Sequence, residues 1–112
     1  MFDTSRLDEA LRSRRLKLEQ ERGALLERVQ EVLRRIRRKH GIEAAWIVGS
    51  LKTPGAWRSS SDVDVAVRGC SHAVLEVMKD LEEATARQVD VIDLDRHPAA
   101  DSFTEAGLEV YG

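Results

Sequence analysis

Two aspartates, Asp62 and Asp64, have the spacing in this sequence that most clearly suggests chemistry. They open residues 62–67, where polar or small residues alternate with valines, a pattern that predicts a β-strand. Because side chains two residues apart in a strand point to the same face, the two carboxylates should lie side by side. Such a pair either faces water or holds a cation between its members. Mg²⁺ suits the second arrangement, because it prefers oxygen ligands and is often completed by phosphates.

A glycine and a serine precede this pair, directly after the apolar run 44–48, which predicts a short buried strand. Gly49 would let a phosphate approach the backbone closely, and Ser50 adds a hydroxyl donor. If a helical turn begins here, its free N–H groups favour an anion. An Asp-x-Asp pair alone is more often a solvent-exposed strand face, and Gly-Ser alone is more often a plain turn. Together they predict a phosphate-binding turn beside a cation site.

The elements that position these residues can be predicted from hydrophobic periodicity. A helix is predicted from near Ser5 to Lys39, with Gly41 as its stop. Residues 24–39 have the wide apolar stripe of a helix packed on a core, whereas residues 5–22 have a thin one. Gly23 lies between these halves and could weaken the helix. We therefore divide the chain into an N-terminal helical arm, 1–40, which projects or pairs with another chain, and a domain, 41–112.

After the aspartate strand, a second helix is predicted to open at Ser71 or His72. A third strand is predicted over residues 88–94, and a last short helix from Pro98 to about Glu105. No element is predicted after that helix. The order is helix, strand, loop, strand, helix, strand, helix, which indicates an α+β fold. The inner side of the second helix is expected to carry Val74, Leu75, Val77, Met78 and Leu81.

Composition excludes some classes of protein. The 112 residues suit one domain, and no apolar run approaches the roughly 20 residues that a membrane span needs. Cys70 is the only cysteine, so no internal disulfide can form, and the sequence indicates a cytoplasmic protein. Residues 1–40 hold twelve Lys/Arg and seven Asp/Glu, whereas the remainder holds six and thirteen. The basic cluster at 34–39 could contact nucleic acid, but stabilisation of the helix C-terminus is the favoured interpretation.

Residues 47–50, a gap of eleven residues and residues 62–65 together resemble the signature of the polymerase-β-like nucleotidyltransferase superfamily. That signature is a hydrophobic residue, Gly, Gly or Ser, a loop, and then Asp, a hydrophobic residue, Asp or Glu, and a hydrophobic residue. Ser61 before the first aspartate, the strand 89–92 and the closing segment 105–111 are similar to minimal nucleotidyltransferases. The resemblance covers about residues 42–111. It implies a small mixed β-sheet flanked by helices, here preceded by a long N-terminal helix.

The resemblance also implies roles by position. Gly49 and Ser50 match the triphosphate-binding pair, and Asp62 and Asp64 match the two metal-bridging carboxylates. Asp90 matches the third carboxylate, which in the family supports the metal site and activates the attacking hydroxyl. The catalytic and metal-binding residues are therefore predicted to be these three aspartates.

Some positions leave alternatives open. Asp93 is a rival for the third carboxylate, although it should point to the opposite face from Asp90. Many relatives have Ala-Arg-Gly soon after Gly-Ser, whereas this chain has a different sequence at 51–55. Lys52 or Arg58 would then have to supply any side-chain contact to phosphate, and Lys52 and Ser61 join the predicted nucleotide-binding residues. Trp57 could stack on a base or pack against the sheet.

The resemblance implies a nucleotidyltransferase that uses ATP and two Mg²⁺ ions to transfer a nucleotidyl (AMP) group to a hydroxyl. The usual partner in the family is a small helical HEPN-type protein, and the expected acceptor is a tyrosine of that toxin, with this chain as antitoxin. An alternative is a catalytically weak nucleotide-binding module that neutralises its partner by direct binding. A third hypothesis is a coiled-coil assembly protein in which the N-terminal helix is the functional part.

Overall fold

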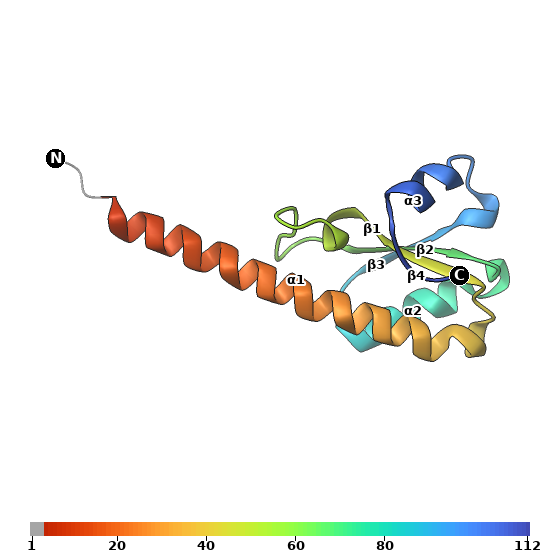
Figure 1. Cartoon of the computed structure of the whole chain (residues 1–112). Coiled ribbons are helices and arrows are strands. Elements are labelled where there is room, and N and C mark those ends of the chain that lie inside the picture. Colours follow the sequence, from red (N-terminus) through yellow and green to blue (C-terminus); the bar gives the residue numbers. More distant parts are fainter. Residues whose placement is uncertain (1–3) are drawn as a thin grey trace.

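The computed structural model describes residues 4–112, in which one long helix is attached to a small α+β domain (Figure 1). The molecule measures 63 × 27 × 19 Å, because helix α1 extends well beyond the domain. Sheet, loops and the other two helices lie around the C-terminal half of α1 (Figure 1). Within residues 4–112, no helix is both long enough and apolar enough to cross a membrane.

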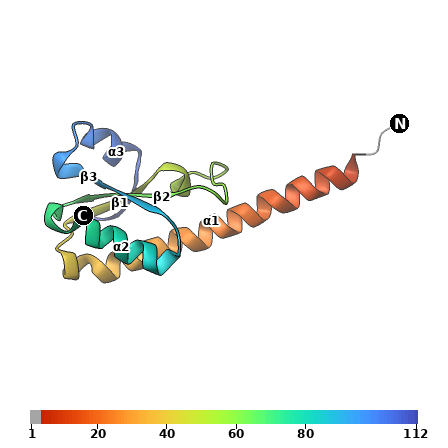
Figure 2. The ribbon, with the colours of Figure 1, turned by 180° about the vertical axis from the view of Figure 1, so that it is seen from behind.

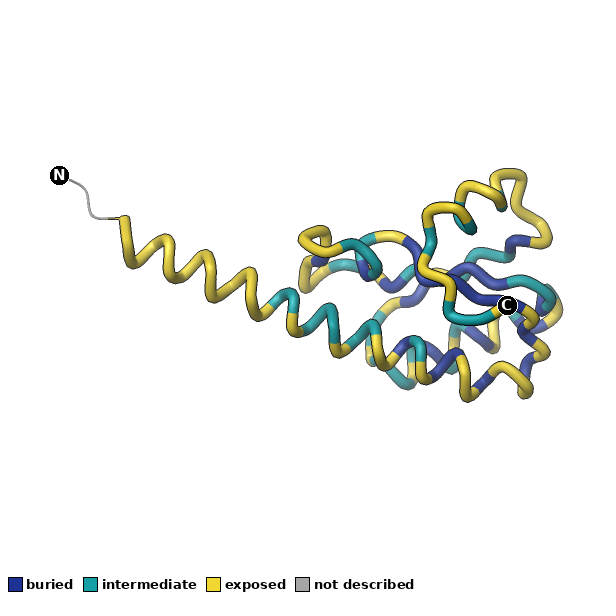
Figure 3. The backbone as a smooth tube through the Cα atoms, viewed as in Figure 1, coloured by how far each residue is buried: buried dark blue, intermediate teal, exposed yellow. Residues whose placement is uncertain are grey.

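Helix α1 spans Ser5–His40 without a break at Gly23, and it begins where the sequence predicted. Residues 5–17 are all exposed, so this part of the helix adds no buried residue to the core (Figure 3). The C-terminal half buries a stripe that includes Val29, Val32 and Leu33, as its wide apolar pattern predicted. Gly41 ends the helix in a left-handed conformation, with φ of 67°, and its N–H donates to the carbonyl of Arg37.

Four strands form a mixed sheet: β1 Ala44–Val48, β2 Val63–Arg68, β3 Val89–Asp93 and β4 Leu108–Tyr111. Their order in the sheet is β3-β2-β1-β4. Strand β1 pairs antiparallel with β2 and β4, whereas β2 pairs parallel with β3. The predicted α+β fold with a small mixed sheet and a long N-terminal helix is confirmed.

The fourth strand corrects the prediction that only a short helix follows the third strand. Helix α3, Ala100–Ala106, is indeed short, but β4 begins two residues after it and pairs with β1. A four-residue strand at a sheet edge shows too little alternation to be distinguished from a loop, and its stability comes from pairing with a strand distant in sequence. The hydroxyl of Tyr111 donates to the carbonyl of Leu33 at 3.0 Å, which ties β4 to α1.

Alternation along the strands gives the sheet two apolar faces. Helices α1 and α2 cover one face, and α3 lies over the other (Figures 1 and 2). The main core contains Val63, Val65 and Val67 of β2, all with no exposed surface, as predicted. A smaller cluster on the α3 side contains Trp46 and Ala66. Because Asp64 alternates with the three valines, its side chain belongs to the α3 side of the sheet.

Helix α2, Val74–Thr85, follows a short 3₁₀ turn at Ser71–Ala73 and buries Val77 and Leu81. The prediction that Leu75 lies on the inner side was wrong, since its side chain is 71% exposed. At 3.6 residues per turn, Leu75 lies well away from the stripe that Val77 and Leu81 share. Asp80 of α2 accepts hydrogen bonds from His40 and Lys39, which holds the pKa of its carboxyl below the usual value and joins α2 to the end of α1.

The two leucines of α2 give a matched test of the core. Leu81→Ala should lower the free energy of unfolding by about 2–5 kcal/mol, because it leaves a cavity in the main cluster. Leu75→Ala, on the same helix, should change it by less than about 0.5 kcal/mol. Urea unfolding of both variants measures the difference. Equal losses would show that α2 is packed differently.

Candidate active site

Gly49 lies at the point where β1 turns toward the loop, and its backbone requires glycine for two reasons. Its φ of +74° lies in the left-handed region that side chains disfavour. A Cβ at this position would also come within 2.5 Å of the Asp64 Oδ2. The turn after β1 therefore lies directly against the carboxylate of the neighbouring strand, and the approach of a phosphate to Gly49 stays a prediction.

Asp64 and Asp90 lie opposite each other. In the parallel pairing of β2 with β3, Asp64 is in register with Asp90, and on its other side Asp64 pairs with Val48. Burial raises the pKa of the Asp64 carboxyl, and the charges of Asp90 and Asp62 and a hydrogen bond with Asp90 raise it further. The fold thus places the half-buried Asp64 carboxylate near two others. This arrangement disfavours the ionised form of Asp64.

Asp62 stands one residue before the start of β2 and is exposed. The N–H of Val63 donates to the carbonyl of Gln88, so the strand pairing begins immediately after it. Asp62 lines a shallow hollow with Ser61 and Arg87 rather than the cavity beside Gly49. The three predicted carboxylates are therefore grouped at one end of β2 and β3, with Asp64 in the middle.

A cavity of about 480 Å³ opens beside the Asp64 carboxylate. This size falls within the roughly 300–1,000 Å³ that is typical of small-molecule sites. Three predicted site residues, Gly49, Lys52 and Asp64, share its wall. The opposite wall comes from α3, through Ser102 and Phe103, which sequence reasoning did not include. The sequence predicted the short helix but contains no signal that it would close over this face.

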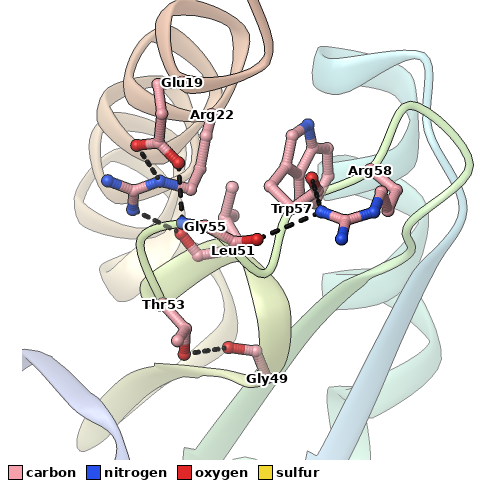
Figure 4. A network of polar contacts seen from close by, with 8 residues as sticks. All are labelled: Glu19, Arg22, Gly49, Leu51, Thr53, Gly55, Trp57 and Arg58. Atoms are coloured by element: carbon pink, nitrogen blue, oxygen red, sulfur yellow. Dashed lines mark hydrogen bonds and ion pairs between the residues drawn. The ribbon is translucent and has the colours of Figure 1, made fainter. Parts of the chain in front are cut away.

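Two predicted nucleotide-binding residues lie outside that wall. Ser50 is half-buried in the 3₁₀ turn Gly49–Lys52, so a helical turn does begin where the sequence suggested. The Ser61 hydroxyl accepts a hydrogen bond from the N–H of Arg58, which closes a turn in the loop. Thr53 stabilises the same loop by donating to the carbonyl of Gly49 at 3.1 Å (Figure 4).

The structure separates the remaining alternatives. Asp93 accepts a hydrogen bond from the N–H of Asp95. Burial raises the pKa of the Cys70 thiol to about 11, and the charges of Asp93 and Asp95 contribute to this shift. Asp93 thus lies at the far end of β3 from Asp90. Trp57 is only 1% exposed, and it packs in the main core instead of facing the cavity.

Among residues 4–112, no three His, Cys, Asp or Glu side chains are arranged to hold a metal ion by themselves. Mg²⁺ in proteins is commonly held by one or two carboxylates, with waters and substrate phosphates completing its shell. The pair Asp64 and Asp90, with Asp62 nearby, fits that requirement, because a cation would relieve the repulsion that raises the Asp64 pKa. The predicted two-ion site stays a prediction.

Comparison with solved structures finds the same fold in toxin–antitoxin complexes. A structure of the toxin–antitoxin MntA-HepT is 20% identical over 80% of this chain and 72% of that chain, with a TM-score of 0.55. A toxin–antitoxin with AMP-PNP is 21% identical over 74% of this chain and 73% of that chain, with a TM-score of 0.62. A mutant of the toxin–antitoxin MntA-HpeT, with two aspartates replaced by glutamate, is 18% identical over 74% of this chain and 72% of that chain, with a TM-score of 0.61.

Curated proteins gave no match to this sequence. The family described as "Polymerase beta, Nucleotidyltransferase" matches residues 30–106, well over half of the chain. The matched region contains the end of α1, the turn at Gly49, the three aspartates and α3. The chain belongs to the polymerase-beta nucleotidyltransferase family.

Proposed function

We propose that this chain uses Mg-ATP to transfer an AMP group to a hydroxyl of a partner protein, as the antitoxin of a toxin–antitoxin pair. The observation that carries the proposal is the position of Asp64. It is in register with Asp90, lies against Gly49 and shares the wall of one cavity with Gly49. Family membership supports nucleotidyl transfer as the reaction. The similar toxin–antitoxin structures, one of them with AMP-PNP, support the nucleotide and the kind of partner.

The predicted metal ligands are Asp62, Asp64 and Asp90. Bound Mg²⁺ would neutralise these carboxylates and the nucleotide phosphates and would polarise the acceptor hydroxyl. In the mutant complex mentioned above, the two replaced aspartates are two positions apart, which is also the spacing of Asp62 and Asp64. This spacing supports their assignment as a functional pair.

The chain's own residues supply the remaining functions. The backbone at Gly49 and the Ser50 hydroxyl donate to the triphosphate, and the Lys52 ammonium adds positive charge to the cavity wall. Asp90 takes the proton of the acceptor hydroxyl. That oxygen bonds to the α-phosphorus, the bond from the α-phosphorus to the leaving oxygen breaks, and pyrophosphate departs.

The acceptor reaches the site from outside the sheet. Strand β3 is an edge strand of the sheet, and Asp90 on it is exposed, so a side chain of a partner can approach it without displacing part of the core. We propose a tyrosine of a small helical HEPN-type protein as that acceptor. A phenolic hydroxyl at the end of a rigid side chain can enter a half-open site of this kind.

Mass spectrometry of the partner after incubation with ATP and Mg²⁺ tests the transfer. Wild type should add AMP to a small helical protein encoded next to this chain, and Asp90→Asn should lower the rate by about 10²–10⁴-fold, because the base is lost. Asp64→Asn should abolish the addition. Asp93→Asn, three residues along the same strand, should react like wild type, because Asp93 lies away from the cavity.

Two outcomes would contradict this proposal. The first is an unmodified partner with wild type although the nucleotide binds, which would favour the alternative of a binding module that neutralises its partner by contact. The second is equal addition by wild type and Asp64→Asn, which would place the reaction elsewhere.

The charge cluster also predicts a stability effect that is independent of transfer. The pKa of Asp64 is raised in the folded state, so the protonated carboxyl favours folding. This contribution to stability is lost as the pH rises from the ordinary pKa of the carboxyl through its raised, folded-state pKa. At pH 7 without Mg²⁺, Asp64→Asn should therefore raise Tm. Removal of a screened like-charge repulsion of about 0.5 kcal/mol corresponds to a rise in Tm of about 2–4 °C.

Differential scanning calorimetry measures this shift. Millimolar Mg²⁺ should raise the Tm of wild type more than that of Asp64→Asn, because the ion relieves the repulsion only where both carboxylates are present. Asp93→Asn serves as the control, because it also removes one negative charge from the sheet but does so away from Asp64. A lower Tm for Asp64→Asn at pH 7 would show that the Asp64 carboxylate stabilises the fold.

A further inference from the structure

Two side chains of helix α1, Glu19 and Arg22, form hydrogen bonds with the loop between β1 and β2 (Figure 4). The Arg22 Nε donates to the Glu19 carboxylate at 3.1 Å, and its Nη1 donates to the carbonyl of Leu51 at 3.0 Å. The other Glu19 oxygen accepts from the N–H of Gly55 at 2.8 Å. The Arg22 side chain is only 13% exposed. We name these four residues the α1–loop contact.

The opposite end of the same loop is also tied to α1, although indirectly. Glu21 forms an ion pair with Arg87, which lies before β3. Arg87 donates to the carbonyl of Ser59 at 3.0 Å and lies over the Trp57 ring, 4.8 Å from its centroid. One turn of α1 therefore fixes the start of the loop directly and its end through Arg87.

This loop has little regular structure of its own. It passes through a 3₁₀ turn and then through exposed residues from Pro54 to Ala56, and Gly55 has a φ of +82°. Ordering each such residue loses backbone conformational entropy, so a loop of this kind needs external partners to adopt one conformation. The α1–loop contact supplies a donor and an acceptor at two points of its backbone.

The charges of the contact are matched. Arg22 is mostly buried, and a buried guanidinium needs an anionic partner, which Glu19 provides. The N–H of Gly55 and the Arg22 guanidinium both hold the pKa of Glu19 below its usual value, so this residue is ionised at neutral pH. The pair therefore acts as one unit in which Glu19 orients Arg22 and Arg22 fixes the carbonyl of Leu51.

We propose that Glu19 and Arg22 are positioning residues that hold the loop, residues 49–61, in the conformation that accepts the nucleoside triphosphate. The proposal rests on the proposed function for the identity of the ligand. Leu51 lies between Ser50 and Lys52, so fixing its carbonyl fixes the orientation of the turn that carries three predicted phosphate-binding residues. Glu19 and Arg22 act through this turn, as neither lines the cavity beside Asp64.

The contact also gives part of the N-terminal helix a function. The family match begins at residue 30, so Glu19 and Arg22 lie before it, in a segment that the chain adds to the matched region. Residues 5–17 extend further and remain exposed. The structure therefore divides the first half of α1 into an exposed arm and one turn that serves the loop.

Nucleotide affinity tests the proposal. Isothermal titration with a non-hydrolysable ATP analogue and Mg²⁺ should show about tenfold weaker binding for Arg22→Ala and for Glu19→Ala, the effect expected for losing one charged hydrogen bond. Glu19→Gln retains an acceptor for Gly55 but removes the anion beside Arg22, so its affinity should fall between those of wild type and Glu19→Ala. Arg28→Ala is the matched control, since Arg28 joins the same helix to the end of α2 and not to the loop, and it should bind like wild type.

Amide hydrogen exchange supplies a second readout that needs no nucleotide. In Glu19→Ala the amide of Gly55 should exchange about tenfold faster or more, while amides of β2 and α2 keep their wild-type protection, and Arg28→Ala should leave Gly55 unchanged. Unchanged exchange at Gly55 together with wild-type affinity in Arg22→Ala would overturn the positioning role. Absence of binding in wild type, with the exchange result intact, would instead overturn the proposed function.

Discussion

The parallel pairing of β2 with β3 is the constraint on which the site depends. It places Asp64 beside Asp90 whatever the charge of the two side chains, because the register is fixed by apolar residues on the other face of β2. A slip of one residue would move Val63 and Val65 out of the core. Burial of these valines therefore holds two carboxylates together against their repulsion. Burial of the Asp64 carboxyl raises its pKa, and the charge of Asp90 raises that pKa further.

Other parts of the chain also shape the region around Asp64. Gly49 ends β1 with a backbone that fits against the Asp64 carboxylate, and α3 closes the cavity from above the sheet. Helix α1 packs its C-terminal half on the opposite face and extends one further turn to the loop that leads from Gly49 to Asp62. The two faces of the sheet thus differ: the face under α1 and α2 forms the main core, and the face under α3 carries the cavity of the candidate site.

Much of this could be predicted from the sequence because the relevant patterns are local. The alternation of Asp64 with valines gave its face, Gly41 gave the end of α1, and the spacing of Gly49 from Asp62 gave the family resemblance. The errors concern contacts between distant segments. Strand β4 is too short to be recognised without its partner β1, and Leu75 could be placed only once the helix had a known orientation. The contacts of Glu19 and Arg22 with the loop span about thirty residues of sequence and leave no local pattern.

The fold places Asp64 and Asp90 side by side, and we propose that a bound cation relieves the repulsion between their carboxylates. Side-chain carboxyl ¹³C chemical shifts, followed against pH by NMR, test this proposal. Asp64 should titrate above the ordinary value of 3.8 in the metal-free protein, and both Asp90→Asn and addition of Mg²⁺ should move its midpoint downward. An Asp64 carboxyl that titrates at its ordinary value, unaffected by Asp90→Asn or by Mg²⁺, would contradict this account.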